Sequence, residues 1–202
     1  GVFDREQSRR ILVAAKERGL RLRVHVDEIL PMGGAELAVS LGADSADHLG
    51  RVSMRGIAEL ANSDTTAVLL PGTTFYLGKS MHAPARRMID AGCAVALATD
   101  FNPGSCYTQS MSLIITLGCI LLKMSPEECL HAVTINPAAS LGLDAEIGSL
   151  HPGKRADMVV LDLPSYQALG YQMGGNRVVT TIVNGEPVMV NAHDPSVQGL
   201  ES

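Results

Sequence analysis

Short runs with the character of β-strands recur along the first half of the chain, and each is followed by a segment with helical signals. The runs lie at spacings of 20 to 30 residues, at positions 22–27, 45–50, 65–72 and 93–100. Two of them contain TTAVLL and CAVALA, which are apolar throughout and do not show the alternation of a half-exposed strand; this is typical of buried parallel strands. Four strand-then-helix units in succession predict an α/β fold built on a parallel sheet.

Start and stop signals for helices lie between these runs. Asp4 with Gln7 three residues later is a capping-box pattern, and Gly19 follows the apolar positions of that first helix. Pro84 and Gly92 mark the two ends of another helix, in the order that helices favour. Further helices are expected at 33–42, at 54–62, at 109–123, from Ser125, and from Asn136 to Gly142.

The pattern changes after residue 147. The segments 158–162 and 178–190 are rich in β-branched residues, and Asn184-Gly185 lies between two strand-like runs, which is a strong hairpin signal. We therefore divide the chain into residues 1–147, which form the parallel-sheet unit, and residues 148–202, which form a segment of a small β module.

The composition is that of a folded globular protein and excludes several classes. Of the 202 residues, 46% are hydrophobic and 18% are charged, and the net charge is −5. The chain has no basic patch, so we expect no nucleic-acid partner. It has no apolar run of about 18 residues, so we expect no membrane span. The four cysteines form no CxxC pair, which favours a reducing, cytoplasmic compartment without disulfides.

Candidate catalytic side chains share one position in the predicted topology. His25, Glu28, His48 and Asp100 each lie at, or just beyond, the C-terminal end of a predicted parallel strand. Active sites of α/β proteins are built at that edge. Imidazole and carboxylate together suit a Zn²⁺ or Fe²⁺ ion that activates water, with a nearby carboxylate as general base. The turn at 102–105 offers backbone N–H groups suited to a substrate carboxylate.

Plainer interpretations compete with this one. A single His at a strand end is usually a polar residue where the sheet meets solvent, and only the joint placement of several such residues favours a site. We expect Asp27 to be a loop residue, and a doubly wound nucleotide-binding domain is disfavoured because the glycines at 33–34 lack the G-x-G-x-x-G spacing. The histidines expected to lie off this edge are His82, His131, His151 and His193.

Four segments carry a resemblance to a known family. HVDE at 25–28, ADHL at 46–49, LLPGTTF at 69–75 and ALATDFNPGS at 96–105 resemble the imidazolonepropionases of histidine degradation, within the amidohydrolase superfamily. The resemblance covers nearly the whole chain. TDFNPGS beside HVDEI is the most specific part, whereas TINPAASLGL and the turn at 148–157 are shared more widely across the superfamily.

The resemblance implies roles for the residues at the strand ends. His25 and Asp100 would be metal ligands, from strands five and eight of a (β/α)₈ barrel. His48, at the end of strand six, would lie near the metal-bound water and the ring carbonyl and polarise it or shuttle protons. Glu28 would hydrogen-bond the substrate ring and help to activate water. The residues that would hold substrate or product are Asn102, Gly104 and Ser105.

The implied reaction opens the ring amide of 4-imidazolone-5-propanoate to give N-formimidoyl-L-glutamate. Hydroxide on one divalent metal ion, zinc or iron, would attack the ring carbonyl, and Asp100 or Glu28 would accept the proton. The partner is then a small-molecule substrate, and the full-length form is expected to be a homodimer. Two other functions stay open: another cyclic amidohydrolase or deaminase of the superfamily, and a non-catalytic half-barrel that serves as an interaction module.

The sequence departs from the family pattern in one large respect. The superfamily's H-x-H pair, which supplies two further metal ligands, occurs nowhere in it. The chain also begins without Met, so we expect it to be cut from a longer protein. The predicted fold is therefore the C-terminal half, strands five to eight, of a TIM-like barrel with part of a small β-sandwich module. Such a fragment is expected to be inactive alone, since two protein ligands are fewer than a zinc site normally uses.

Overall fold

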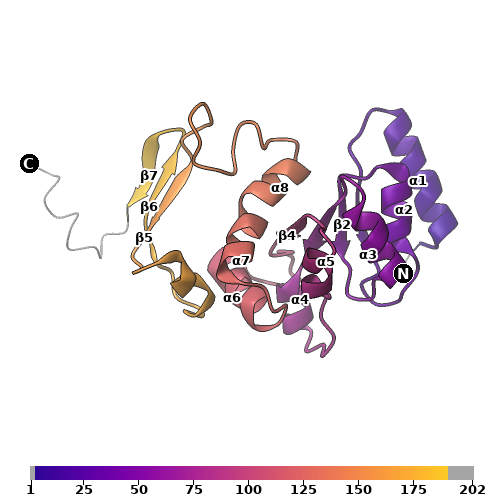
Figure 1. The fold of residues 1–202 in the computed structure, drawn as a ribbon, viewed down its shortest axis with the longest axis horizontal. Coiled ribbons are helices and arrows are strands. Elements are labelled where there is room, and N and C mark those ends of the chain that lie inside the picture. Colours follow the sequence, from indigo (N-terminus) through magenta and orange to yellow (C-terminus); the bar gives the residue numbers. More distant parts are fainter. Residues whose placement is uncertain (1–2, 191–202) are drawn as a thin grey trace, which may run out of the picture.

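A four-stranded parallel sheet organises the first half of the protein (Figure 1). The structure is a computed structural model and describes residues 3–190. The strands lie side by side in the order of the sequence, with His25 paired to Asp47 and Val68 paired to Ala96 in the register. The strands are β1 (Arg23–Val26), β2 (Ser45–His48), β3 (Thr66–Leu69) and β4 (Val95–Leu97). The four predicted strands and their parallel arrangement are confirmed.

Helices connect the strands as the sequence predicts. Asp4 caps α1 (Arg5–Glu17), and Asp4 and Gln7 form the full capping box. The connecting helices that follow are α2 (Gly34–Leu41), α3 (Met54–Ala61) and α5 (Ala85–Asp90). Their apolar faces pack with the outward residues of the strands into one core, in which the largest fully buried side chains include Leu37, Leu49, Leu60, Leu69 and Met88.

One α-helix of the parallel-sheet unit was not predicted. The apolar run at 65–72 does not stay a strand to its end, because β3 stops at Leu69 and α4 (Pro71–Tyr76) begins almost at once. Pro71 favours this start because proline, which has no N–H, fits the first helical position. Gly72 allows the helix to lie close to its neighbours, since a Cβ at this position would lie 2.8 Å from the sulfur of Cys106. This helix and the segment that follows it bring two further residues to the candidate site.

Three helices follow β4. They are α6 (Met111–Ile120), α7 (Pro126–Val133) and α8 (Ile135–Ser140). Helix α6 is shorter than the predicted 109–123: it starts at Met111 because the side chain of Ser110 caps it, and it ends at Ile120. Ser125 and Glu128 form a second capping box, and Arg86 of α5 donates two hydrogen bonds to the Glu128 carboxylate, 2.8 and 2.9 Å long. Helix α7 is thereby fixed to α5.

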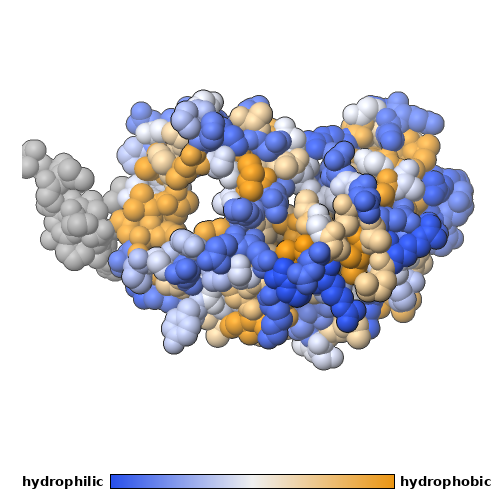
Figure 2. Space-filling view, viewed as in Figure 1, coloured by the Kyte–Doolittle hydropathy of each residue, from blue (hydrophilic) through white to orange (hydrophobic). Residues whose placement is uncertain are grey.

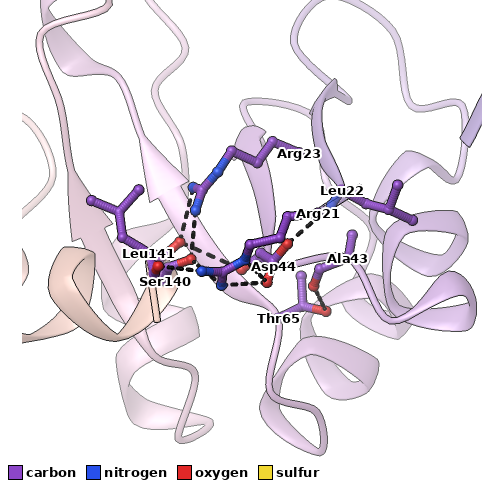
Figure 3. Close-up of polar contacts among 8 residues, drawn as sticks. All are labelled: Arg21, Leu22, Arg23, Ala43, Asp44, Thr65, Ser140 and Leu141. Atoms are coloured by element: carbon purple, nitrogen blue, oxygen red, sulfur yellow. Dashed lines mark hydrogen bonds and ion pairs between the residues drawn. The ribbon is translucent and has the colours of Figure 1, made fainter. Parts of the chain in front are cut away.

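A polar cluster joins α8 to the opposite, N-terminal end of the sheet (Figure 3). Arg21 pairs with Asp44 and donates to the carbonyl oxygens of Ser140 and Leu141, and Arg23 donates to the same Ser140 carbonyl. Both arginines therefore satisfy carbonyl groups at the C-terminal end of α8, where a helix favours positive charge. These contacts hold α8, which follows β4, against the start of β1.

The last part of the described chain is a separate three-stranded antiparallel sheet, which lies at the far end of the molecule from α1 (Figure 1). It contains β5 (Met158–Leu161), β6 (Val178–Val183) and β7 (Glu186–Val190), and the short helix η1 (Tyr166–Gly170) lies between the first two. Asn184 and Gly185 have φ values of 53° and 87°, as a two-residue hairpin turn with two positive φ angles requires, so the predicted hairpin is confirmed. His193 lies outside the described residues.

Candidate active site

The four side chains predicted to act together do converge at the C-terminal edge of the parallel sheet. Nε2 of His48 lies 3.8 Å from Oε2 of Glu28 and 3.9 Å from Oδ2 of Asp100. The rings of His25 and His48 lie side by side, with their centroids 4.9 Å apart. His48 is therefore the centre of the cluster, with a carboxylate on either side and a second imidazole next to it.

The backbone at the strand ends is unusual and directs these side chains. His48 has a φ of 74° and Asp100 a φ of 53°, in the left-handed region that side chains other than glycine rarely adopt. Residues in this region cluster at functional sites because the surrounding fold must hold them there. His48 is the last residue of β2, and Asp100 lies shortly after the end of β4.

His48 is buried, and this decides its protonation. Burial lowers its pKa; Glu28 and Asp100 act in the opposite direction, but the net shift is below the ordinary histidine value. The imidazole is therefore mainly neutral at neutral pH. A neutral imidazole can both accept and donate a proton, which suits a residue that exchanges protons with substrate or water.

Glu28 has a cationic neighbour that the sequence did not suggest. Nζ of Lys79 lies 3.1 Å from Oε1 of Glu28. Burial alone would raise the pKa of Glu28, but the hydrogen bond from Lys79 and the charges of His48 and His25 outweigh it and lower the pKa. Glu28 is therefore ionised and able to accept a proton or a hydrogen bond. Lys79 follows α4 in an irregular segment, where neither periodicity nor spacing marks it.

Asp100 also has a partner that the sequence did not suggest. The hydroxyl of Thr73, in α4, donates a hydrogen bond of 2.5 Å to Oδ2 of Asp100. Thr73 is only 2% exposed, so its hydroxyl is a buried group that needs an acceptor. Thr73 belongs to the LLPGTTF motif. Because the apolar run before it predicted a strand, the sequence did not predict that Thr73 lies beside Asp100.

The turn after Asp100 is held by one side chain. Oδ1 of Asn102 accepts hydrogen bonds from the backbone N–H groups of Gly104 (2.9 Å) and Ser105 (2.8 Å). Its amide nitrogen donates to the carbonyl oxygen of Asp100 over 2.8 Å and to the Ser105 hydroxyl. The backbone N–H groups of Gly104 and Ser105 are thus directed inward, toward Asn102. A substrate-binding role for these three residues stays a prediction.

Asp27 has the structural role of a capping residue. Its carboxylate accepts hydrogen bonds from the backbone N–H groups of Met32, Gly34 and Ala35, at 2.8 to 3.1 Å. These N–H groups lie at the start of α2, so Asp27 stabilises the helix that follows the first strand. Of the other histidines in the described residues, His131 lies in α7 and His151 before β5, whereas His82, before α5, lines a pocket with Gly50 and Arg51, just beyond the end of β2.

Asp47 is a further acid beside the cluster. It pairs in register with His25, so both lie on the same face of the sheet. Its Oδ1 atom is buried and has no hydrogen-bond partner among the described residues. Burial raises the pKa of its carboxyl group, against the lowering charges of His25 and Arg23. Nothing at sequence level separated Asp47 from an ordinary strand residue.

The donor chemistry of the cluster fits a divalent metal ion, but the set is incomplete. Imidazole nitrogen and carboxylate oxygen, as in His25 and Asp100, are ligands for zinc and for iron. Within residues 3–190, however, no group of three or more His, Cys, Asp or Glu side chains is placed to hold a metal ion. No helix in that part of the chain is long and apolar enough to cross a membrane.

Comparison with known sequences defines the class. The sequence pattern of the amidohydrolase family matches residues 3–188. The chain therefore belongs to the amidohydrolase family. It is 54% identical over 192 residues to an imidazolonepropionase of Porphyromonas gingivalis, and 52% identical over 189 residues to one of Bacillus velezensis. These matches cover 95% and 94% of this chain but only 45% of each relative, so the chain spans about half the length of the curated relatives it matches.

Solved structures show the same fold in more distant proteins. An adenosine deaminase of Xanthomonas campestris with bound zinc superposes with a TM-score of 0.75 at 22% identity, over 93% of this chain and 50% of that one. A 5-methylcytosine deaminase of Klebsiella pneumoniae superposes with a TM-score of 0.76 at 22% identity, over 94% of this chain and 54% of that one. At this identity the likeness establishes the fold, and the activity has to be argued from the site.

Proposed function

We propose that this chain carries the proton-handling side of an imidazolonepropionase active site, in a protein that hydrolyses 4-imidazolone-5-propanoate to N-formimidoyl-L-glutamate. The observation that carries the proposal is the placement of His48 between Glu28 and Asp100, 3.8 and 3.9 Å away. The identity of 54% to an imidazolonepropionase over 95% of the chain supports this substrate over those of other amidohydrolases.

The environment of each residue at the site suggests a different role in the reaction. Glu28, ionised beside Lys79, is placed to accept a hydrogen bond from the substrate ring and to take up a proton from water. His48, neutral and buried, is placed to donate a hydrogen bond to the ring carbonyl as negative charge develops on it. The turn that starts at Asn102 forms the wall next to Asp100 and is proposed to hold the substrate together with Gly104 and Ser105.

His25 and Asp100 are proposed to hold one divalent ion, zinc or iron. When bound, such an ion supplies Lewis-acid activation of water. Two protein ligands are fewer than a zinc site normally uses, so the remaining ligands have to come from outside the described residues. Zinc in the similar adenosine deaminase structure supports a divalent ion of this kind.

The sheet is proposed to be half of a closed barrel, strands five to eight. Strands β1 and β4 each have a partner on one side only within the described chain, and open edges of this kind are a hazard that closed barrels remove. A groove of about 560 Å³ runs along β1 and is lined by apolar side chains that include Phe3, Ile11 and Leu30. These three side chains are 51% to 56% exposed, as a surface that another part of the protein covers would be.

The antiparallel sheet shows the same incompleteness. Val159, Val188 and Met189 of β5 and β7 are 45% to 61% exposed, and apolar surface lies over these strands in Figure 2. A sheet normally buries one face against another layer. We therefore assign this sheet to a β-sandwich module that the rest of the protein completes. A cytoplasmic homodimer is the proposed state of that protein.

The test is turnover by the protein expressed from the complete reading frame that encodes this chain. We expect hydrolysis of 4-imidazolone-5-propanoate and none of guanine or a hydantoin. His48→Asn should lower kcat at least ~10²-fold, since general acid–base catalysis contributes that much. His131→Asn is the matched control, because His131 is exposed in α7, and it should behave as wild type. Turnover of guanine or a hydantoin in place of the imidazolone would overturn the assignment of substrate.

A further inference from the structure

Thr73 lies at a junction between two neighbouring strands. Strands β3 and β4 are paired, and α4 starts directly after β3 while Asp100 follows shortly after β4. Both residues therefore lie just beyond the C-terminal edge of the sheet, side by side. The Thr73 hydroxyl is buried and donates to Oδ2 of Asp100 over 2.5 Å.

The direction of this hydrogen bond is informative. A threonine in a helix often bonds the carbonyl of the residue three or four positions earlier. For Thr73 the carbonyl four positions earlier is that of Leu69, which already accepts the N–H of Ala98 at 3.2 Å. Thr73 instead turns its hydroxyl across to the neighbouring strand end. The close approach that makes this possible depends on Gly72, where a Cβ would lie 2.8 Å from Cys106 Sγ and 2.9 Å from Ile114 Cδ1.

Asp100 needs such support, because its backbone is held in an unfavourable region. Its φ of 53° costs energy for a residue other than glycine, on the order of 1 kcal/mol. The Asn102 amide holds its backbone carbonyl over 2.8 Å, and Thr73 holds its carboxylate. Hydrogen bonds thus hold both the backbone carbonyl and the side-chain carboxylate of Asp100. Both contacts described for the carboxylate involve Oδ2, so within the described chain Oδ1 is the oxygen left for a ligand.

We propose that Thr73 is a positioning residue for metal binding: its hydroxyl fixes the rotation of the Asp100 carboxylate so that Oδ1 is presented to the ion. The inference rests on the proposed role of Asp100 as a metal ligand. Hydrogen bonds to ligating carboxylates orient them, and losing such a partner typically weakens metal affinity 10- to 100-fold. Thr73 itself touches neither the ion nor the substrate.

The experiment compares Thr73→Val, which replaces the hydroxyl by a methyl group, with Thr73→Ser, which keeps it. Both are made in the protein from the complete reading frame, and Zn²⁺ and Co²⁺ affinities are measured by competition with a chromophoric chelator. The absorption spectrum of the Co²⁺-loaded protein reports the geometry of the ligands. Thr116→Val is the matched control, because Thr116 is also buried and its hydroxyl bonds Ser112 and Leu169, away from the site.

We expect Thr73→Val to weaken metal affinity ~10- to 100-fold and to change the Co²⁺ spectrum, while Thr73→Ser stays within about threefold of wild type. Thr116→Val should lower the melting temperature of the metal-free protein and leave metal affinity unchanged. If Thr73→Val does not fold, Thr73→Ala removes the hydroxyl without adding bulk. Wild-type affinity in the folded Val or Ala variant, or equal losses in the Val and Ser variants, would overturn the role of Thr73.

Turnover of 4-imidazolone-5-propanoate is measured on the same samples and separates the two proposals. A wild-type protein that binds metal but leaves this substrate intact would overturn the proposed function, and the Thr73 result would stand on metal affinity alone. A wild-type protein that binds no metal while still hydrolysing the substrate would overturn the role of Thr73 and of Asp100 as a ligand.

Discussion

The ammonium group of Lys79 lies 3.1 Å from one oxygen of Glu28, and the other oxygen of the same carboxylate faces His48. One carboxylate therefore links a cation from the segment after α4 to the buried imidazole at the end of β2. Both Lys79 and Glu28 are about one-third exposed, so the pair lies on the solvent side of the buried His48.

Replacing Lys79 should change the pH dependence of catalysis in the complete protein. Lys79 lowers the pKa of Glu28, so Lys79→Met should raise it and move the acid limb of the kcat/KM profile to higher pH. The loss of activity is expected on the acid side of the profile and should recover as the pH rises. Lys79→Arg keeps the charge and should leave the limb in place; a shift of equal size in both variants would contradict this explanation.

Asp100→Ala should abolish metal binding and turnover together. The variant removes one of the two ligands proposed from this chain, and the measurement is metal content by atomic emission beside the steady-state rate. Asp64, which is exposed at the end of the segment after α3, provides the matched control Asp64→Ala. Full metal occupancy with lost activity would instead make Asp100 a general base.

Gly72→Ala should destabilise the protein by about 1–3 kcal/mol, because the added methyl group meets buried atoms in a close-packed region. The new Cβ would lie 2.8 Å from Cys106 Sγ and 2.9 Å from Ile114 Cδ1. Urea denaturation measures the change in the free energy of unfolding. At Gly175 an added Cβ meets nothing closer than 4.0 Å, so Gly175→Ala should be close to neutral. Equal stability of the two variants would show that α4 can shift without cost.

The pair of Arg21 and Asp44 should make stability fall in acid. Burial raises the pKa of Asp44, but Arg21 and the N–H of Leu22 outweigh it, so the folded-state pKa lies below the unfolded value. A carboxyl with a depressed pKa contributes stability that is present above the unfolded pKa and is lost as pH falls through the folded pKa. The melting temperature of Asp44→Asn should therefore lie below that of wild type at pH 7, and the difference should shrink as the pH falls below the ordinary aspartate pKa. A constant difference across this range would contradict the prediction.

The sequence was sufficient to place His25, His48 and Asp100 together, because the ends of successive parallel strands must meet at one edge. It was not sufficient for Thr73 and Lys79. Their positions depend on the turn at Pro71, which ends a strand within an apolar run that could have continued it. The sequence did not predict Asp47 for another reason. Its burial depends on the packing of neighbouring strands, and residue type alone does not indicate that packing.

The left-handed backbone at the strand ends restricts the evolutionary routes open to this site. At His48 and Asp100 the φ angles of 74° and 53° disfavour most side chains, above all the β-branched ones, while His, Asp and Asn are among the residues that tolerate them best. A drifting sequence would therefore sample mainly residues that can bind metals or transfer protons. New chemistry within this fold can then arise by exchange among a few reactive residue types, without passing through variants that fail to fold.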